Sequence, residues 1–225
     1  MTSLSINPRI YLNEQPPAPP TPPAPQPPTA EEVYQAVDAL LIASKEAMQQ
    51  DPAAREQLKQ ISSEVKTTFK ADLTGLAEVP QTAEDCRLLA LNALAAGMLA
   101  GALDGAVLMH ADAASQVAAP RSQSNPDGIG EDIGKAIDRF FEELQQKLAE
   151  AVEKMKEVGA DALQAASAQG KEFGSQAVDE SERLVGANKL QAQAYMASVF
   201  GLGYAIGGTD AAIVMIANQV PGQEG

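Results

Sequence analysis

The sequence predicts an all-α fold, an elongated bundle built from two related units that each combine an amphipathic arm with a Gly/Ala-rich apolar helix. Apolar residues recur at helical spacing through most of the chain beyond residue 29. The alternation typical of strands and the Asn-Gly turn of hairpins do not occur. Two apolar segments, 97–109 and 203–215, match each other after a shift of 106 positions. We expect about five helices.

The matching segments carry small residues and one acid at equivalent positions. The shift places Gly97 on Gly203, Gly101 on Gly207, Asp104 on Asp210, Ala106 on Ala212 and Met109 on Met215. Glycines four residues apart line one face of a helix and allow another backbone to approach closely. Each glycine costs up to about 1 kcal/mol of helix propensity, which demands a packing reason. We therefore interpret these as helix-packing or interface residues: Gly97, Gly101, Gly105, Gly203 and Gly207.

The first 29 residues end in a proline-rich run, which predicts a disordered, extended tail because proline lacks the amide hydrogen of helices and sheets. Such a tail serves as a spacer or as a ligand for an aromatic groove. A first helical unit is expected over residues 30–119. Its first helix begins at a capping box formed by Thr29 and Glu32 and is interrupted at Asp51-Pro52.

A second helix should end near residues 75–80, and Thr82 with Asp85 caps the start of a third. A polar segment rich in helix breakers, 120–128, is expected to link the two units.

The second unit is expected over residues 129–219, followed by a C-terminal tail, 220–225. A long helical pattern from 129 to 184 precedes its apolar helix. The pattern has an 11-residue period, so its stripe stays nearly straight or winds faintly right-handed. It fits a long antiparallel helix pair, a right-handed coiled coil or a helix that lies flat on an interface. Its stripe comprises Ile133, Ile137, Phe141, Leu144, Leu148, Val152, Met155, Gly159, Leu163, Ala166 and Gly170.

The chain is uniformly acidic, with a net charge of −14. Residues 30–119 hold 6 basic and 13 acidic side chains, and residues 120–225 hold 9 and 16. A negative surface repels phosphate backbones, so nucleic acid is not an expected partner. Cys86 is the single cysteine, so no internal disulfide forms, and the N-terminus lacks the pattern of a secretory signal. These features favour a cytoplasmic location, with membrane association as an alternative.

The two apolar stretches, 88–109 and 194–217, are long enough to cross a bilayer of about 30 Å. Each contains one aspartate, which costs about 2.5–3.5 kcal/mol at the centre of a spanning helix. Neither is flanked by a cluster of Lys or Arg. Burial within a bundle and insertion into a membrane both account for the glycine faces, and both interpretations stay open.

Asp104 and Asp210 are the candidate chemical groups, since paired helices would bring equivalent carboxylates together into a pH-sensitive contact. Alternatively, each acid caps a neighbouring helix or faces solvent. His110 is the single histidine, and with Cys86 it is too few ligands for zinc. No phosphate-binding loop or nucleophile elbow occurs. We expect no enzyme activity, no cofactor and no metal; a small hydrolase would need a catalytic group that the sequence does not show.

The segments around Asp104-Gly-Ala and Asp210-Ala-Ala are similar to the apolar helices of R-body subunits, bacterial self-assembling ribbons in which an amide or acid precedes alanine. The similarity is confined to these short segments and implies self-assembly. Independently, the sequence predicts a non-enzymatic structural or scaffold protein that associates with itself or with another helical protein through its small-residue helices. The alternative is a pore-forming or channel-like protein that inserts the two glycine-bearing helices as a hairpin.

Overall fold

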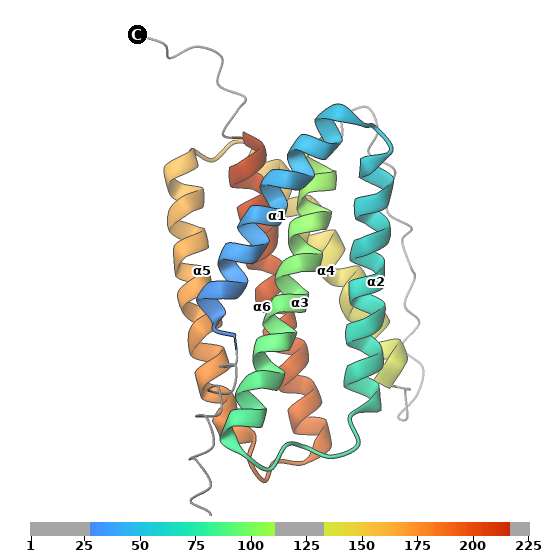
Figure 1. The fold of residues 1–225 in the computed structure, drawn as a ribbon, viewed down its shortest axis with the longest axis vertical. Coiled ribbons are helices and arrows are strands. Elements are labelled where there is room, and N and C mark those ends of the chain that lie inside the picture. Colours follow the sequence, from blue (N-terminus) through green and yellow to red (C-terminus); the bar gives the residue numbers. More distant parts are fainter. Residues whose placement is uncertain (1–27, 111–132, 217–225) are drawn as a thin grey trace, which may run out of the picture.

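The computed structural model describes residues 28–110 and 133–216, and all the regular elements in these ranges are helices. The helices run along the long axis of a bundle (Figure 1). They are α1 (Ala30–Gln50), α2 (Ala54–Gly75), α3 (Ala83–His110), α4 (Ile133–Met155), α5 (Ala160–Glu180), the short 3-10 helix η2 (Ser181–Leu184) and α6 (Lys189–Ile216). The predicted all-α class is confirmed. The predictions of a disordered tail over 1–29, a linker over 120–128 and a C-terminal tail over 220–225 fall almost wholly outside the described residues.

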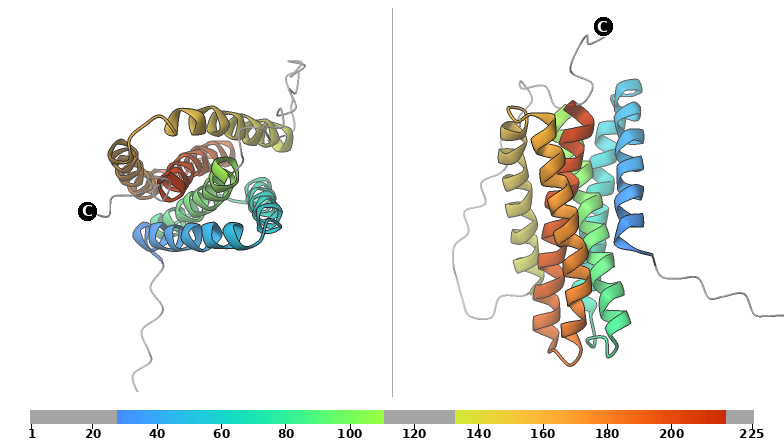
Figure 2. Two further views of the ribbon diagram at one scale, coloured as in Figure 1. Left: turned by 90° about the horizontal axis from the view of Figure 1, so that it is seen from above. Right: turned by 90° about the vertical axis from the view of Figure 1, so that its left-hand side faces the viewer.

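The repeat extends beyond the two short segments that reveal it in the sequence. A shift of 106 carries the bounds of α3, Ala83–His110, onto those of α6, Lys189–Ile216. Each unit follows the same path, with its first and third helices parallel and its second antiparallel to them (Figure 1). Viewed from the end, α3 and α6 lie at the centre, with α1 and α2 on one side and α4 and α5 on the other (Figure 2).

The predicted helix boundaries in the first unit are confirmed by their caps. The Glu32 amide donates to Thr29 Oγ1 at 3.3 Å and the Thr29 amide donates to Glu32 Oε2 at 2.7 Å, which is a complete capping box. Asp51 has an extended conformation and ends α1 before the proline. The Asp85 amide donates to Thr82 Oγ1 at 3.1 Å at the start of α3.

The helical pattern from 129 to 184 forms two antiparallel helices rather than one continuous helix, because the chain reverses between Met155 and Ala160. Gly159 adopts an extended conformation, with ψ 151°, and precedes the first residue of α5. Most of the predicted stripe is buried or half-buried on both sides of this turn, because both helices bury one face against the same core, whereas Ile133, Gly159 and Ala166 are exposed. The spacing of apolar residues predicts which face of a helix is buried, but it does not show where the chain reverses its direction.

Glycines on α3 and α6 bring the two central backbones into contact. A Cβ atom built on each would overlap a carbonyl oxygen of the facing helix, as follows: Gly97 with Phe200, Gly203 with Leu94, Gly101 with Tyr204, and Gly207 with Met98. If 106 is added to the α3 residue number of a pair and subtracted from its α6 residue number, the result is another of these four pairs; Gly97 with Phe200, for example, becomes Gly203 with Leu94. The contacts therefore obey a pseudo-twofold axis that runs along the helices, and the two helices are parallel.

This parallel arrangement differs from the hairpin in the alternative interpretation. Residue numbers on both sides of the contact rise together, from Gly97 and Phe200 to Gly101 and Tyr204. The α4 and α5 helices, joined to α3 through residues outside the described ranges, separate α3 from α6 in the chain. The two glycine-bearing helices do not form a hairpin in this structure.

The four outer helices each bury one face against the α3–α6 pair and present charged residues outward. The largest fully buried side chains belong mainly to α3 and α6 and include Tyr204, Phe200, Leu94, Met98, Leu103 and Met196. On one side of the pair, Phe69 of α2, Phe141 of α4 and Phe200 of α6 form an aromatic cluster with ring centroids 4.3–6.4 Å apart.

We predict that Gly101→Ala destabilises the fold by about 3 kcal/mol, because the added methyl group overlaps the Tyr204 carbonyl and the helices must separate. Gly75→Ala is the matched control, since nothing lies within 4 Å of its Cβ position. Alanine there should stabilise by up to about 1 kcal/mol through helix propensity. Urea denaturation measures both values, and equal effects at the two positions would contradict the close contact.

Candidate functional site

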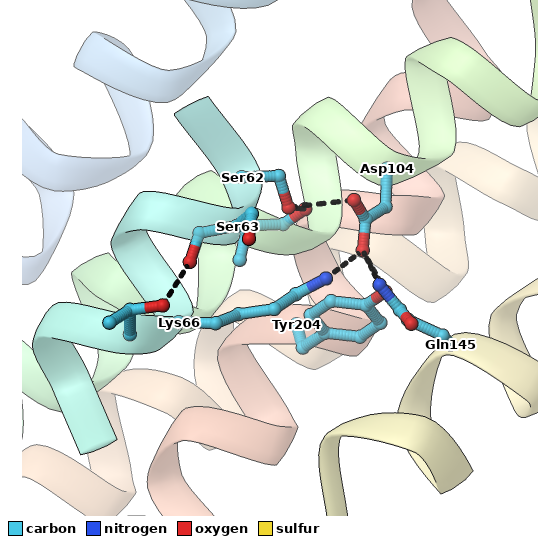
Figure 3. A network of polar contacts seen from close by, with 8 residues as sticks. Ser62, Ser63, Lys66, Asp104, Gln145 and Tyr204 are labelled. Carbon is cyan, nitrogen blue, oxygen red and sulfur yellow. Dashed lines mark hydrogen bonds and ion pairs between the residues drawn. The ribbon is translucent and has the colours of Figure 1, made fainter. Parts of the chain in front are cut away.

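Asp104 of α3 is the centre of a polar cluster, the Asp104 site, inside the bundle (Figure 3). Ser62 Oγ donates to Asp104 Oδ1 at 2.6 Å, and Lys66 Nζ lies 2.5 Å from Oδ2. Tyr204 of α6 donates its hydroxyl to the same Oδ2 at 2.5 Å, and Gln145 Nε2 of α4 lies 3.4 Å from it. The carboxylate thus connects four helices.

The positions of these side chains follow from helical spacing. Ser62 and Lys66 are four residues apart on α2, so both project from one face toward α3. Lys66 is buried, and its ammonium also lies 5.5 Å from the centre of the Tyr204 ring. A buried charge requires a partner of this kind, because removing it from water costs several kcal/mol.

Asp210 of α6 is the centre of an equivalent cluster, the Asp210 site, in the second unit. Ser167 Oγ of α5 donates to Asp210 Oδ1, and Lys171 Nζ lies 3.2 Å from Oδ2. Lys171 also donates to Asp38 Oδ2 of α1 at 3.1 Å, and its ammonium lies 5.7 Å from the centre of the Tyr34 ring. Asp210 is 4% exposed.

The sequence predicts both aspartates as candidate groups but does not identify their partners. A Leu-x3-Ser-x3-Lys pattern occurs on α2 at residues 58–66 and on α5 at residues 163–171, related by a shift of 105. Each copy lies opposite the aspartate of its own unit. This repeated pattern was a detectable signal, but nothing in local periodicity connects it to an acid 38 to 43 positions away.

The structure does not bring Asp104 and Asp210 together. Each carboxylate is bound by a Ser-Lys pair of its own unit, and no hydrogen bond joins the two within the described ranges. They do not cap neighbouring helices either. The expected contact between two carboxylates is replaced by two separate ion pairs, which tie α2 to α3 and α5 to α6.

The two sites differ in how fully the carboxylate is bound. Asp104 has four side-chain partners, while Asp210 has Ser167 and Lys171. The position equivalent to Tyr204 in the first unit is Met98, which has no hydroxyl. A cavity of about 350 Å³ opens beside the Asp210 site. Fewer hydrogen bonds therefore offset the cost of burying the charged carboxylate at Asp210 than at Asp104.

Burial raises the pKa of Asp210 above its ordinary value, and this outweighs the opposing effects of the Ser167 hydrogen bond and the Lys171 charge. Burial lowers the pKa of Lys171, but the Asp210 charge and the Asp38 hydrogen bond reverse the sign and leave it raised. Both shifts favour the protonated forms. Burial also raises the pKa of Tyr204, together with the nearby Asp104 charge, so its hydroxyl remains a donor.

The other candidate groups show no geometry for nucleophilic catalysis. Ser62 and Ser167 are buried and donate to carboxylates. His110 is exposed at the end of α3. Cys86 is buried with its thiol 3.6 Å from the Pro80 carbonyl, and burial raises its pKa. Across residues 28–110 and 133–216, no three His, Cys, Asp or Glu side chains are grouped to hold a metal ion.

A groove of about 560 Å³ lies between α2 and α3, and we call it the α2–α3 groove. Its lining is mainly apolar and includes Ile61, Val65, Phe69, Leu73, Leu76, Leu89, Ala96, Leu99 and Met196. Glu64 and Asp72 are its charged lining residues. Ile61, on its wall, is 43% exposed.

The second unit is bridged at the equivalent place. Tyr195 aligns with Leu89, and its hydroxyl donates to the Ala177 carbonyl at 2.5 Å, across from α6 to α5. Ala177 in turn aligns with Asp72 of the groove under the shift of 105. The first unit has an apolar leucine at the position of this tyrosine, and there the groove is open.

Both central helices are long and apolar enough to cross a membrane, with a mean hydropathy of 1.6 each. In the bundle, 61% of each apolar window is buried. Core helices of soluble proteins meet the same criterion, so the hydropathy alone decides nothing about a membrane.

Comparison with protein-family models, with curated proteins and with solved structures finds no match to this chain. The similarity to R-body subunits has no support from these comparisons. The function must therefore be argued from the geometry.

We predict that Lys66→Met destabilises the fold by about 3–5 kcal/mol, because Asp104 stays buried without its cation. Adding Asp104→Asn should recover part of this loss. Lys59→Met is the control, since Lys59 is exposed and pairs with Glu56 on the same helix, and it should cost less than about 1 kcal/mol. Thermal and urea denaturation measure the three variants. A loss at Lys66 no larger than at Lys59 would mean that the ion pair is not buried.

We predict that the stability difference between wild type and Asp210→Asn depends on pH. The pKa of Asp210 is raised in the folded state above 3.8, so the folded state binds this proton more tightly than the unfolded state. Its stabilising contribution is fully present below 3.8 and is lost as pH rises through the folded-state pKa. The unfolding free energy of wild type minus that of the variant should therefore fall with rising pH. A difference that rises with pH would show that the Lys171 pair outweighs burial.

Proposed function

We propose that this protein is a non-enzymatic structural protein that self-associates, and that the α2–α3 groove is the surface through which it does so. The observation that carries the proposal is an open groove of about 560 Å³ with a mainly apolar lining. Exposed apolar surface that is concave and rimmed by polar groups is typical of protein–protein contact.

We propose association through the groove and not through the glycine faces of α3 and α6, which the sequence predicts as interface residues. Gly97, Gly101, Gly203 and Gly207 contact the facing helix of the same chain, so association through them would require the core to open. The glycines support self-association indirectly. They fix α3 and α6 in a rigid pair, and a rigid surface loses little conformational entropy when it binds.

A second copy of this chain is the partner that we propose. The chain has a net charge of −14, so two copies repel each other electrostatically. They associate only if the burial of apolar surface offsets this repulsion. The groove offers such surface: Ile61, Leu99 and, from α6, Met196 are among its lining residues. The remaining polar lining is small, with Thr68 and Asn92 beside the two acids.

Membrane insertion is the second candidate, and the hydropathy of α3 and α6 supports it. In this candidate the four outer helices would leave the central pair, which requires the Asp104 and Asp210 ion pairs to break. Exposing either carboxylate to hydrocarbon costs about 2.5–3.5 kcal/mol. The parallel orientation of the pair also requires a further crossing between them. Because of these two requirements, membrane insertion is a less favoured candidate function than self-association.

We predict that wild type forms oligomers without detergent and that Ile61→Glu shifts it toward the monomer, because a carboxylate would be buried in the apolar groove. Light scattering after size exclusion, over a range of concentrations, measures the mass. Ile42→Glu is the matched control: Ile42 lies on α1, outside the groove, and is 54% exposed. Its mass should equal that of wild type.

A monomer at every concentration would contradict the proposal, as would equal effects of the two substitutions. Recovery of the protein only in detergent, with leakage of dye from anionic liposomes, would favour membrane insertion instead.

A further inference from the structure

We propose that the α2–α3 groove of one copy binds the segment Ile6–Leu12 of a second copy. This inference rests on the proposed function, because it names the part of the partner that occupies the association surface. The segment belongs to the N-terminal region outside the described residues, and its sequence is Ile-Asn-Pro-Arg-Ile-Tyr-Leu.

The segment has the apolar content and the length that the groove requires. It contains Ile6, Ile10, Tyr11 and Leu12, whereas the residues between it and α1 are mostly proline, alanine and glutamine. The groove extends along α2 from Ile61 to Leu76, which is about 22 Å at 1.5 Å per residue. Seven residues in an extended conformation span about 20 Å. Pro8 favours that conformation because it restricts the residue before it to the extended region.

The charges of the segment and of the groove are also complementary. Arg9 is the single charged side chain of the segment. Among the described residues that line the groove, Glu64 and Asp72 are acidic and none is a lysine or arginine. Both acids lie on α2, two turns apart on the same side of the groove. A guanidinium group reaches a carboxylate there without crossing the apolar floor.

The proline tract between the segment and the bundle favours a second copy over the segment's own groove. Residues 16–28 contain nine prolines, and at about 3.1 Å per residue they predict a stiff spacer of roughly 40 Å. Pro28 and Thr29 line a cavity together with Ala83 and Leu88 at the start of α3, next to Leu89 at the near end of the groove. A stiff spacer that leaves the bundle beside its own groove carries the segment well beyond it.

The same spacer keeps two acidic bundles far enough apart for salt to screen their electrostatic repulsion. Each chain carries a net charge of −14, and charges in solution interact over a Debye length of about 8 Å at physiological salt. A spacer of roughly 40 Å lets a segment whose one charge is positive bind a neighbouring bundle while the two bundles remain several Debye lengths apart. Repeated from copy to copy, this contact is head-to-tail and builds either closed rings or open chains.

Tyr11→Trp tests the inference in the full-length protein, since the chain has no other tryptophan. We expect the tryptophan emission to move to shorter wavelength as protein concentration rises, in parallel with the mass from light scattering. Ile61→Glu in the same protein should abolish both changes, and Ile42→Glu should abolish neither. Ile10→Asp combined with Leu12→Asp should weaken association roughly tenfold or more, while Ala18→Asp, in the spacer, is the matched control.

The outcomes separate this inference from the proposed function. If mass rises and Ile61→Glu prevents it, but the tryptophan emission and the Ile10/Leu12 variant show no change, the segment is not the occupant and self-association through the groove stands. An emission shift independent of concentration would place the segment in its own groove and overturn binding to a second copy. If the mass never rises, both proposals are wrong.

Discussion

Direct contact between the backbones of α3 and α6 is the constraint on which the rest of this structure depends. Glycines at four equivalent positions let each helix place carbonyl groups where side chains would otherwise be. Because the contacts repeat under exchange of the two helices, they define a pseudo-twofold axis, and the outer helices take equivalent places about it.

Two buried ion pairs attach the second helix of each unit to this centre. Ser62 and Lys66 hold Asp104, and Ser167 and Lys171 hold Asp210. Such pairs add little net stability but strongly disfavour any arrangement that leaves a charge unpaired, so they specify which helix packs where. Among the described residues, the two units differ at the groove: it is open in the first unit, whereas Tyr195 bridges α6 to α5 at the equivalent place in the second. This asymmetry leaves an open apolar groove in the first unit, and that groove is the association surface that we propose.

The sequence contained most of the fold and part of the candidate site. Caps at Thr29 and Thr82 and the break at Asp51 involve neighbours in the chain, and local rules predicted them correctly. The glycine spacing identified the central helices because a missing side chain in a helix needs a packing reason. The reversal at Gly159 was missed because the spacing of apolar and small residues in the sequence continues through it. The relative direction of α3 and α6 is set by contacts that periodicity does not encode. The partners of Asp104 and the groove were missed for the same reason: they arise between helices far apart in sequence.

The parallel α3–α6 pair is the central claim, and distances between spin labels test it most directly. Labels at Asn92 and Ser198 report one level of the pair, and labels at His110 and Ile216 report its other end; Cys86 is buried and should not react. In a parallel pair related by the 106-residue shift, both distances are short and similar. In an antiparallel hairpin the His110–Ile216 distance approaches the full length of the helices, about 40 Å, and that result would contradict the account.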